Sequence, residues 1–187
     1  RRAPKRSGPG RVYRAAELPV IKIAPGASAT IAWGKGALLE LLEVQPNVSL
    51  AAEVLAGEAI TLVQEGSLTY TGGNRTLQLG KDEFLYLTPR TKRLLKAGPQ
   101  GAKAIEVFSP VRLDHLRLAG VKLPKGGKAS FPDQGIKKTS VQPGKVYNLN
   151  EVQWTGITRP DRTKTYKRST AHSRLIWGKN VMLSFVR

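Results

Sequence analysis

Residues 58–89 decide the fold, and they read EAITLVQEGSLTYTGGNRTLQLGKDEFLYLTP. Runs of four or five apolar, β-branched and aromatic residues between Gly-containing turns are typical of strands. The segment Thr69–Arg75 has the Gly and Asn residues of a tight hairpin turn. We therefore expect antiparallel strands here rather than helices, over the runs Ala59–Val63, Ser67–Tyr70 and Glu83–Leu87.

The same pattern continues on both sides of this stretch. Further strands are predicted at Val20–Ile23, Ala37–Val44 and Ala104–Phe108. Ala51–Ala59 has helical propensity, but it has no helix cap and lies between two strand signals, so we interpret it as extended. Many short strands with Gly-rich turns indicate an antiparallel sandwich or barrel. The expected fold class is all-β.

Composition excludes several kinds of site. The chain has 187 residues, 40% of them hydrophobic, and no cysteine. It is long enough to bury a core, and it has no disulfide framework, thiolate metal site or Cys nucleophile. No apolar run approaches the roughly 20 residues of a membrane helix, so no membrane partner is expected. The chain begins at Arg1 rather than Met, as a processed chain does, so the compartment stays unknown and secretion or a periplasmic location is compatible with the sequence.

The formal net charge of +18 lies at the two ends of the sequence. Residues 1–14 hold six basic residues and no acid, residues 15–116 hold ten of each, and residues 117–187 hold fifteen basic and three acidic residues. The neutral middle block argues against a nucleic-acid interface there, although cationic flanks attract any polyanion. We expect a basic N-terminal segment over residues 1–14 and a Lys-, Gly- and Pro-rich linker over residues 117–143, and nucleic acid is not the expected partner.

Two blocks of sequence recur in the same order. GRVYRAAE at residues 10–17 matches GKVYNLNE at residues 144–151, and IAWGKGALL at residues 31–39 matches LIWGKNVML at residues 175–183. Residues 144–187 are therefore expected to be the first strands of a second barrel. An incomplete barrel leaves open strand edges and an uncovered apolar face. The repeat thus predicts, as a partner, the C-terminal remainder of the second barrel as a separate chain. By the same match, Val12-Tyr13 is predicted to be a strand like Val146-Tyr147.

Three stretches resemble the cupin superfamily. EAITLVQEGSL (residues 58–68) and LGKDEFLYLTP (residues 79–89) are similar to two strand–turn motifs of that family. VFSPVRLDHL (residues 107–116) is similar to the end of cupins that linearise unsaturated uronates in pectin breakdown. The resemblance implies a double-stranded β-helix, a jelly-roll-like cupin barrel, over residues 15–116. Together with the repeat it implies a two-barrel protein, a bicupin, in which residues 144–187 begin the second barrel.

Most cupin enzymes hold a divalent metal through His-x-His, a Glu or Gln, and a third His. The resemblance places these positions on Ala51, Glu53, Glu58 and Arg93, so no His remains among them. Ala51 cannot coordinate, and the positive charge of Arg93 opposes a cation. Either Glu53 and Glu58 hold a hard cation through oxygen, or the metal site is lost and Arg93 pairs with Glu53 or Glu58. We favour the second interpretation, with no metal or other cofactor in this barrel and a divalent metal left open for the second one.

The two histidines of the chain lie elsewhere. His115 is assigned to the tail after the barrel, and His172 to the second copy. The last predicted strand keeps an acid-x-Phe-x-x-x-Arg spacing of the uronate-linearising relatives in Glu106, Phe108 and Arg112. The resemblance implies that the acid moves a proton and that the Arg holds a sugar carboxylate, which a guanidinium binds bidentately. In the alternative, Phe108 packs in the core and Arg112 pairs with Asp114 or another surface acid.

These observations favour a cupin-fold protein whose first barrel has lost its His ligands. We expect a non-catalytic barrel that is structural or binds an acidic sugar-like ligand, an acidic small molecule or saccharide, through Arg93 and Arg112. In the alternative, the chain is part of a metal-dependent bicupin enzyme, a carbohydrate or uronate isomerase or a dioxygenase, with its active site in the second barrel. A homo-oligomer is compatible with either function. No catalytic residue is assigned, and the candidate pocket residues are Glu53, Glu58, Arg93, Glu106, Phe108 and Arg112.

Overall fold

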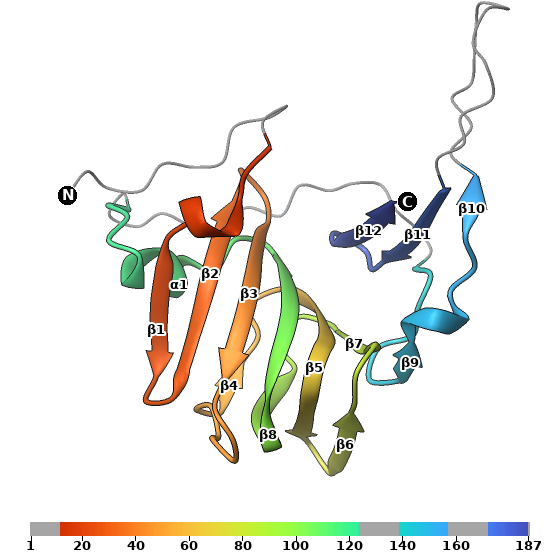
Figure 1. Ribbon diagram of the computed structural model, residues 1–187, viewed down its shortest axis with the longest axis horizontal. Helices are drawn as coiled ribbons and strands as arrows, with labels where there is room; N and C mark the ends of the chain where they lie inside the picture. The colour runs from red at the N-terminus through yellow and green to blue at the C-terminus, as the bar shows by residue number, and fades with distance from the viewer. Residues whose placement is uncertain (1–11, 124–138, 157–171, 187) are drawn as a thin grey trace, which may run out of the picture.

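The computed structural model describes residues 12–123, 139–156 and 172–186. Strands dominate these residues, which confirms the predicted all-β fold class (Figure 1). The helical elements described are α1 (Leu113–Leu118) and two single turns, η1 (Ala15–Glu17) and η2 (Leu149–Glu151). The strands are β1 (Val20–Ala24), β2 (Ala27–Trp33), β3 (Leu38–Val44), β4 (Glu53–Val54), β5 (Glu58–Gly72), β6 (Arg75–Leu79), β7 (Glu83–Leu87), β8 (Lys92–Ser109), β9 (Val146–Asn148), β10 (Thr155–Gly156), β11 (His172–Trp177) and β12 (Met182–Val186).

The main sheet is antiparallel and has the order β1-β2-β3-β8-β5-β7-β9, with β4 paired to β8 and β6 paired to β5. Its two long strands, β5 and β8, pair from Glu58↔Ser109 to Gly66↔Ala102 and again from Leu68↔Ala97 to Thr71↔Leu94. The register shifts twice along this pair, between Val63 and Glu65 and again between Gly66 and Leu68. Such bulges bend a strand and increase its twist, so the sheet can curl into a barrel. We call residues 15–123, with β1–β8 and α1, the first barrel.

Alternation of side chains along each strand gives this sheet an inner and an outer face. The inner face holds the larger core cluster, and the outer face holds a second cluster. On β5, for example, Ala59 and Val63 point inward, whereas Ile60 and Leu62 point outward. On β7, Leu85 and Leu87 point inward, and Phe84 and Tyr86 point outward.

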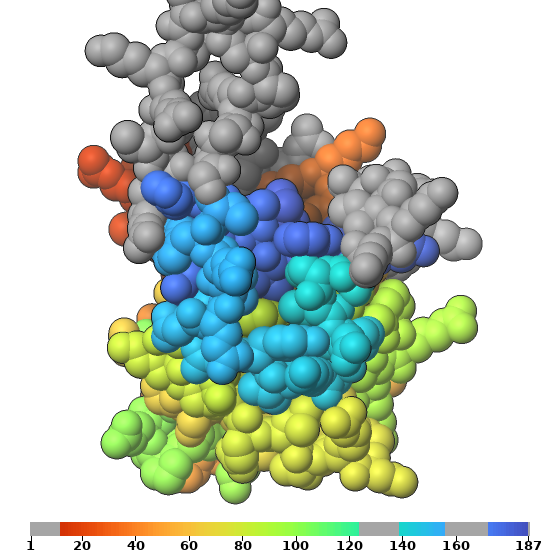
Figure 2. Space-filling view, turned by 90° about the vertical axis from the view of Figure 1, so that its right-hand side faces the viewer, coloured from red at the N-terminus to blue at the C-terminus, as the bar shows by residue number. Residues whose placement is uncertain are grey.

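Residues 139–156 and 172–186 form an outer layer that covers this outer face (Figure 2). The strand β9 extends the main sheet by pairing with β7, from Glu83↔Asn148 to Leu85↔Val146. Phe84 stacks on Tyr147 with 5.4 Å between the ring centroids. The strands β10, β11 and β12 form a separate three-stranded sheet. Residues of the outer layer that pack into the second cluster are Val141, Tyr147, Leu149, Val152, Ile176, Val181, Leu183 and Phe185.

Some of the local predictions are confirmed and one is wrong. The hairpin at Thr69–Arg75 is confirmed, because Gly72 pairs with Arg75 across a two-residue turn. Ala51–Ala59 contains no helix and includes the two-residue strand β4. The prediction of a Val12-Tyr13 strand is wrong: these residues are not in a strand, and Val12 is exposed. Its sequence equivalent, β9, has the edge of β7 to pair with.

Several predicted segments fall partly outside the described residues. These are the basic N-terminal segment (1–14), of which residues 12–14 are described, and the linker (117–143), of which residues 117–123 and 139–143 are described. The predicted boundary between barrel and linker falls inside α1, and Val141 is buried rather than exposed. Among the described residues, no helix has the length and apolar character needed to span a membrane.

Candidate functional site

A cavity of about 770 Å³ opens at one end of the inner face of the first barrel. Its wall is largely apolar, with Leu50 and Leu55 from the chain around β4 and Leu113 and Leu118 from α1. Its floor is charged. All six predicted pocket residues line the cavity, together with two that sequence reasoning did not propose as pocket residues: Glu53, Glu58, Arg93, Glu106, Phe108, Arg112, Asp114 and His115.

Arg93 is the centre of the charged floor. Its side chain is only 2% exposed and donates to two carboxylates. Nε lies 2.7 Å from Glu53 Oε1, and Nη1 lies 2.6 Å from Glu106 Oε1. Nη2 lies 3.3 Å from Glu106 Oε2, so the Arg93–Glu106 pair is bidentate. Charge-assisted, forked pairs of this kind are among the strongest hydrogen bonds in proteins.

Strand pairing places these charges together. Glu53 on β4 lies directly opposite Arg93 on β8, and Glu106 further along β8 lies opposite Thr61 on β5. Thr61 Oγ1 donates to Glu106 Oε1 at 2.5 Å. Each buried charge therefore has a partner from a neighbouring strand. Without such partners, burying these groups would cost several kcal/mol.

Arg112 extends the charged floor towards solvent. Its Nη2 lies 2.7 Å from Glu53 Oε2 and 2.5 Å from Asp114 Oδ2. Both guanidinium groups also contact the ring of Phe108, with their Cζ atoms 5.3 Å (Arg93) and 5.1 Å (Arg112) from the ring centroid. This geometry adds a cation–π attraction from each arginine. We refer to Glu53, Thr61, Arg93, Glu106, Arg112 and Asp114 as the ion-pair network.

A second buried pair joins α1 to the barrel wall. Glu40 on β3 is fully buried and its Oε1 contacts His115 Nδ1. His115 also has its Nε2 3.8 Å from Asp114 Oδ2 and makes an edge contact with Phe108. Glu40 Oε2 has no hydrogen-bond partner among the described residues. The pair thus fixes α1 over the cavity while leaving one buried carboxylate oxygen unsatisfied.

The pKa values reflect these partners. Burial alone would raise the pKa of Glu106, but the charge and hydrogen bonds of Arg93, with help from Thr61, lower it. Burial alone would also raise the pKa of Asp114, but the hydrogen bond and the charge of Arg112 lower it. For Glu40 burial prevails over the hydrogen bond and charge of His115, so the pKa of Glu40 is raised. The network carboxylates are therefore matched at neutral pH, whereas Glu40 is not fully compensated.

This difference predicts the effect of Glu40→Gln on stability. A raised pKa in the folded state favours the protonated carboxyl, so its contribution to stability is present at low pH and is lost as the pH rises above 4.5, the ordinary value, through the folded-state pKa. Gln cannot ionise and removes that loss. We expect the stability of Glu40→Gln relative to the unsubstituted protein to rise between pH 5 and pH 8, measured by urea unfolding.

The matched control is Glu43→Gln, an exposed position three residues further along β3. It is expected to leave the pH dependence unchanged. Parallel pH profiles for the unsubstituted protein and Glu40→Gln would contradict the assignment of the pH dependence to Glu40.

Glu58 also lines the cavity, but its carboxylate bonds to the outer layer rather than to the ion-pair network. It belongs to the outward-pointing series of β5, and its carboxylate accepts hydrogen bonds from Asn180 N at 2.8 Å and from Asn180 Nδ2 at 2.9 Å. Burial, followed by the charge of Glu58, raises the pKa of the neighbouring Tyr86 to about 12. Glu58 therefore anchors the β11–β12 hairpin. Its inward-pointing neighbour on β5 is Ala59, which has no ligand atom.

The residues at the predicted metal positions do not fit a divalent metal. Ala51 has no donor, Glu58 faces the outer layer, and Arg93 places a positive charge against Glu53 and Glu106. The described ranges contain no group of three or more His, Cys, Asp or Glu side chains arranged to hold a metal ion. The pairing of Arg93 predicted from the sequence is found with Glu53, not with Glu58, and it includes Glu106 as well.

Glu40, Thr61 and His115 were missed by sequence reasoning. The sequence did contain a signal for Glu40, because this residue lies on the same face of a predicted strand as Leu38, Leu42 and Val44. An acid at that inward parity needs a buried partner. His115 gave no comparable signal, since its role depends on α1 folding back over the barrel.

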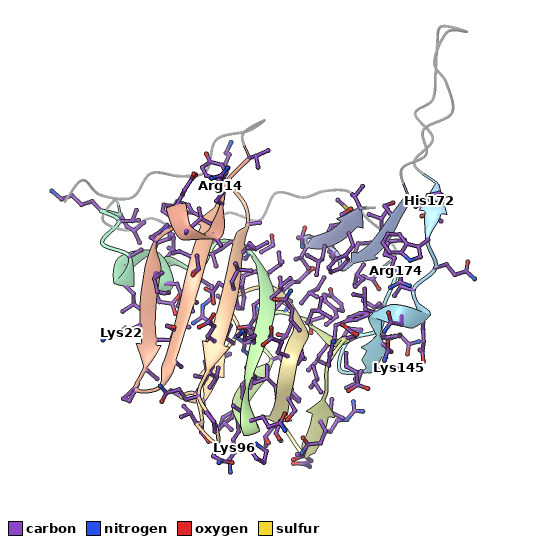
Figure 3. The ribbon with its side chains drawn as sticks, in the orientation of Figure 1. Arg14, Lys22, Lys96, Lys145, His172 and Arg174 are labelled. Atoms are coloured by element: carbon purple, nitrogen blue, oxygen red, sulfur yellow. The ribbon has the colours of Figure 1, made fainter. Side chains whose placement is uncertain are left out.

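Basic residues of the described chain point in several directions. Figure 3 labels Arg14, Lys22, Lys96 and Lys145, which come from different elements and lie on different sides of the molecule. Lys145 itself lies over the ring of Tyr147, and Arg174 lies over the ring of Trp154, both in the outer layer. The labelled residues do not form a single stripe of the kind that follows a nucleic-acid backbone.

The backbone is similar to two solved structures of cupin barrels. One is an RmlC-like cupin from Shewanella frigidimarina, with 14% identity and a TM-score of 0.51, over 55% of this chain and 93% of that one. The other is KdgF from Halomonas sp., with 16% identity and a TM-score of 0.52, over 57% of this chain and 98% of that one. No protein-family model and no curated protein sequence matches the chain. The chain has the cupin fold, as its sequence resemblance predicted.

Proposed function

We propose that the first barrel is a non-catalytic cupin barrel with two roles, a structural role for the outer layer and a ligand-binding role for the cavity. The main support for this proposal is Arg93, which stands at the position where the cupin resemblance expects the third His ligand. Its side chain is 2% exposed and forms ion pairs with Glu53 and Glu106. A guanidinium that repels a cation, and that neutralises the carboxylates a cation would use, replaces metal binding with ion pairing.

The structural role is supported by the outer face. Glu58 accepts two hydrogen bonds from Asn180, and the second core cluster is shared between the barrel and the outer layer. A position that the resemblance assigns to a metal ligand thus serves to hold another part of the chain. Hydrophobic burial across this contact stabilises the outer layer on the barrel.

The ligand-binding role is supported by Arg112 more than by Arg93. Arg93 uses Nε, Nη1 and Nη2 within the ion-pair network, whereas Arg112 is 16% exposed and makes no hydrogen bond from Nη1 to another described residue. Its partner Asp114 is 58% exposed, so this carboxylate can turn into solvent. We propose that the carboxylate of an acidic sugar-like ligand replaces Asp114 on Arg112, with the sugar ring against the apolar wall of the cavity.

A titration with a hexuronate, D-galacturonate, tests this role by calorimetry. Asp114→Asn removes the competing carboxylate and is expected to tighten binding by roughly tenfold, while Arg112→Gln is expected to abolish it. D-galactose, which lacks the carboxylate, is the ligand control and is expected to bind much more weakly. Equal affinity for the two sugars, or unchanged binding in Arg112→Gln, would overturn the ligand-binding role but not the structural one.

Metal binding is tested separately on the same protein. Titration with Mn(II), Co(II), Ni(II) and Zn(II), followed by desalting and elemental analysis, is expected to leave no metal that depends on Glu53. A stoichiometric metal that is lost in Glu53→Gln would contradict the proposal. The alternative of a metal-dependent enzyme with its site in a second barrel stays a prediction, and a stoichiometric metal insensitive to Glu53→Gln would favour it.

A further inference from the structure

The sheet β10–β12 reproduces β1–β3 residue by residue. In the first barrel, β2 and β3 pair from Trp33↔Leu38 to Ala29↔Leu42. In the outer layer, β11 and β12 pair from Trp177↔Met182 to Ser173↔Val186, which is the same register 144 residues later, as Trp33 and Trp177 show. The hairpins close with the same bond, Gly34 N to Ala37 O at 2.9 Å and Gly178 N to Val181 O at 2.8 Å.

The first strands of the two sheets agree as well. Ile21 pairs with Ala29 in the first barrel, and Thr155 pairs with Ser173 in the outer layer. The turn η1 lies 134 residues before η2, as their first residues Ala15 and Leu149 show. The two sheets are thus the same supersecondary unit, and what surrounds one indicates what fits the other.

The two copies differ in how far equivalent side chains are buried. Leu38 and Leu42 of β3 are 0% and 1% exposed, whereas the equivalent Met182 and Val186 of β12 are 60% and 63% exposed. In the first barrel, these positions face the inner core cluster. In β12, the opposite side chains, Leu183 and Phe185, pack against the outer face of the first barrel. The face of β12 that corresponds to a barrel interior is therefore the exposed one.

The missing neighbour can be identified from the first copy. There the second edge of β3 pairs with β8, from Leu38↔Phe108 to Leu42↔Ala104. Within the described ranges, β12 pairs with β11 alone. Exposed strand edges with apolar side chains pair readily with another chain. Since β11 already occupies one edge of β12, as β2 does for β3, an added strand must extend this sheet on the edge that β8 occupies in the first barrel.

We propose that the edge of β12 that no described strand occupies is a docking site for an antiparallel strand of a partner chain with the pattern of β8. In that pattern, Ala104, Glu106 and Phe108 face the barrel interior and alternate with residues that face outward. The partner strand would place apolar side chains beside Met182 and Val186. It would also supply hydrogen-bond partners for the backbone groups on the second edge of β12. This inference does not depend on the ligand or metal chemistry of the first barrel.

Hydrogen exchange of the full chain tests the docking site, with a capped peptide of residues 101–109 (GAKAIEVFS) as the probe. At about 1 mM peptide, we expect the backbone amides of Met182–Val186 to exchange roughly tenfold more slowly, with no change in β3. Met182→Asp is expected to abolish this protection. The matched control is Val20→Asp, an exposed strand position of similar exposure, 66%, which is expected to retain it.

Four results would overturn the proposal. The first is that the peptide does not slow exchange in β12 at any concentration, and the second is that it slows exchange equally in Met182→Asp. The third is that the amides of β12 are already protected in the chain alone at every protein concentration, which would mean that the chain covers its own edge. Protection that rises with protein concentration in the absence of peptide would instead identify a second copy of this chain as the occupant.

Discussion

Replacing Arg93 by Met is expected to lower the free energy of unfolding by about 3–5 kcal/mol. Arg93 neutralises Glu106, which is buried, and Glu53, which is partly exposed. Its removal leaves Glu106 with Thr61 as its remaining hydrogen-bond donor among the described residues. A buried carboxylate without a counter-charge must be protonated or become hydrated, and both cost folding free energy. Chemical unfolding followed by tryptophan fluorescence measures the loss.

A double variant separates charge from volume. Arg93→Met with Glu106→Leu removes both charges and keeps apolar bulk in the barrel, so it is expected to recover at least half of the stability that Arg93→Met loses. Lys92→Met is the control, an exposed neighbour on β8 that is expected to change stability by less than about 0.5 kcal/mol. A double variant less stable than Arg93→Met would show that Arg93 acts through packing rather than through its charge.

The second large effect is expected at Gly178, in the β11–β12 hairpin. A Cβ at this position would lie 2.4 Å from Tyr86 Cε2 and 2.8 Å from Glu58 Oε2, closer than atoms can approach. Gly178→Ala therefore forces either the hairpin or the buried side chains of Tyr86 and Glu58 to shift. We expect a cost of about 1–3 kcal/mol, together with faster hydrogen exchange and earlier proteolysis in residues 172–186.

The repeat supplies the control for this prediction. Gly34 occupies the equivalent position in the β2–β3 hairpin and has nothing within 4 Å of its added Cβ. Gly34→Ala is therefore expected to leave stability nearly unchanged. If the two substitutions cost the same, the effect at Gly178 arises from the backbone of the hairpin, and the contact with Tyr86 and Glu58 contributes nothing.

The fold was more accessible from the sequence than the site. Strands follow from alternation and turns, both of which are local, so the hairpin at Thr69–Arg75 was predicted correctly. The internal repeat was also visible, and the matching registers of β2–β3 and β11–β12 support it. The failures depended on distant neighbours. Val12-Tyr13 and Val146-Tyr147 have the same two residue types, but only the second pair lies beside an available strand edge.

The candidate site came from the family resemblance. The resemblance assigned Glu53, Arg93, Glu106 and Arg112 to one pocket, and all four line the same cavity in the structure. The resemblance put Glu58 in the same set, although the parity of Glu58 on β5 turns its carboxylate towards the outer layer. A shift of one residue along a strand reverses the face. Strand parity would have added Glu40 to the candidate residues and would have indicated the outward direction of Glu58.

The Glu40–His115 pair also sets an order of events during synthesis of the chain. Glu40 emerges from the ribosome 75 residues before the histidine that it contacts, and β3 emerges well before its neighbour β8. Until then, the β2–β3 hairpin can form alone, because its contacts are local, while its acid stays hydrated. Barrel closure must wait for the last strand and α1. Whatever protects the nascent apolar face during that interval therefore acts before residue 115 has emerged from the ribosome.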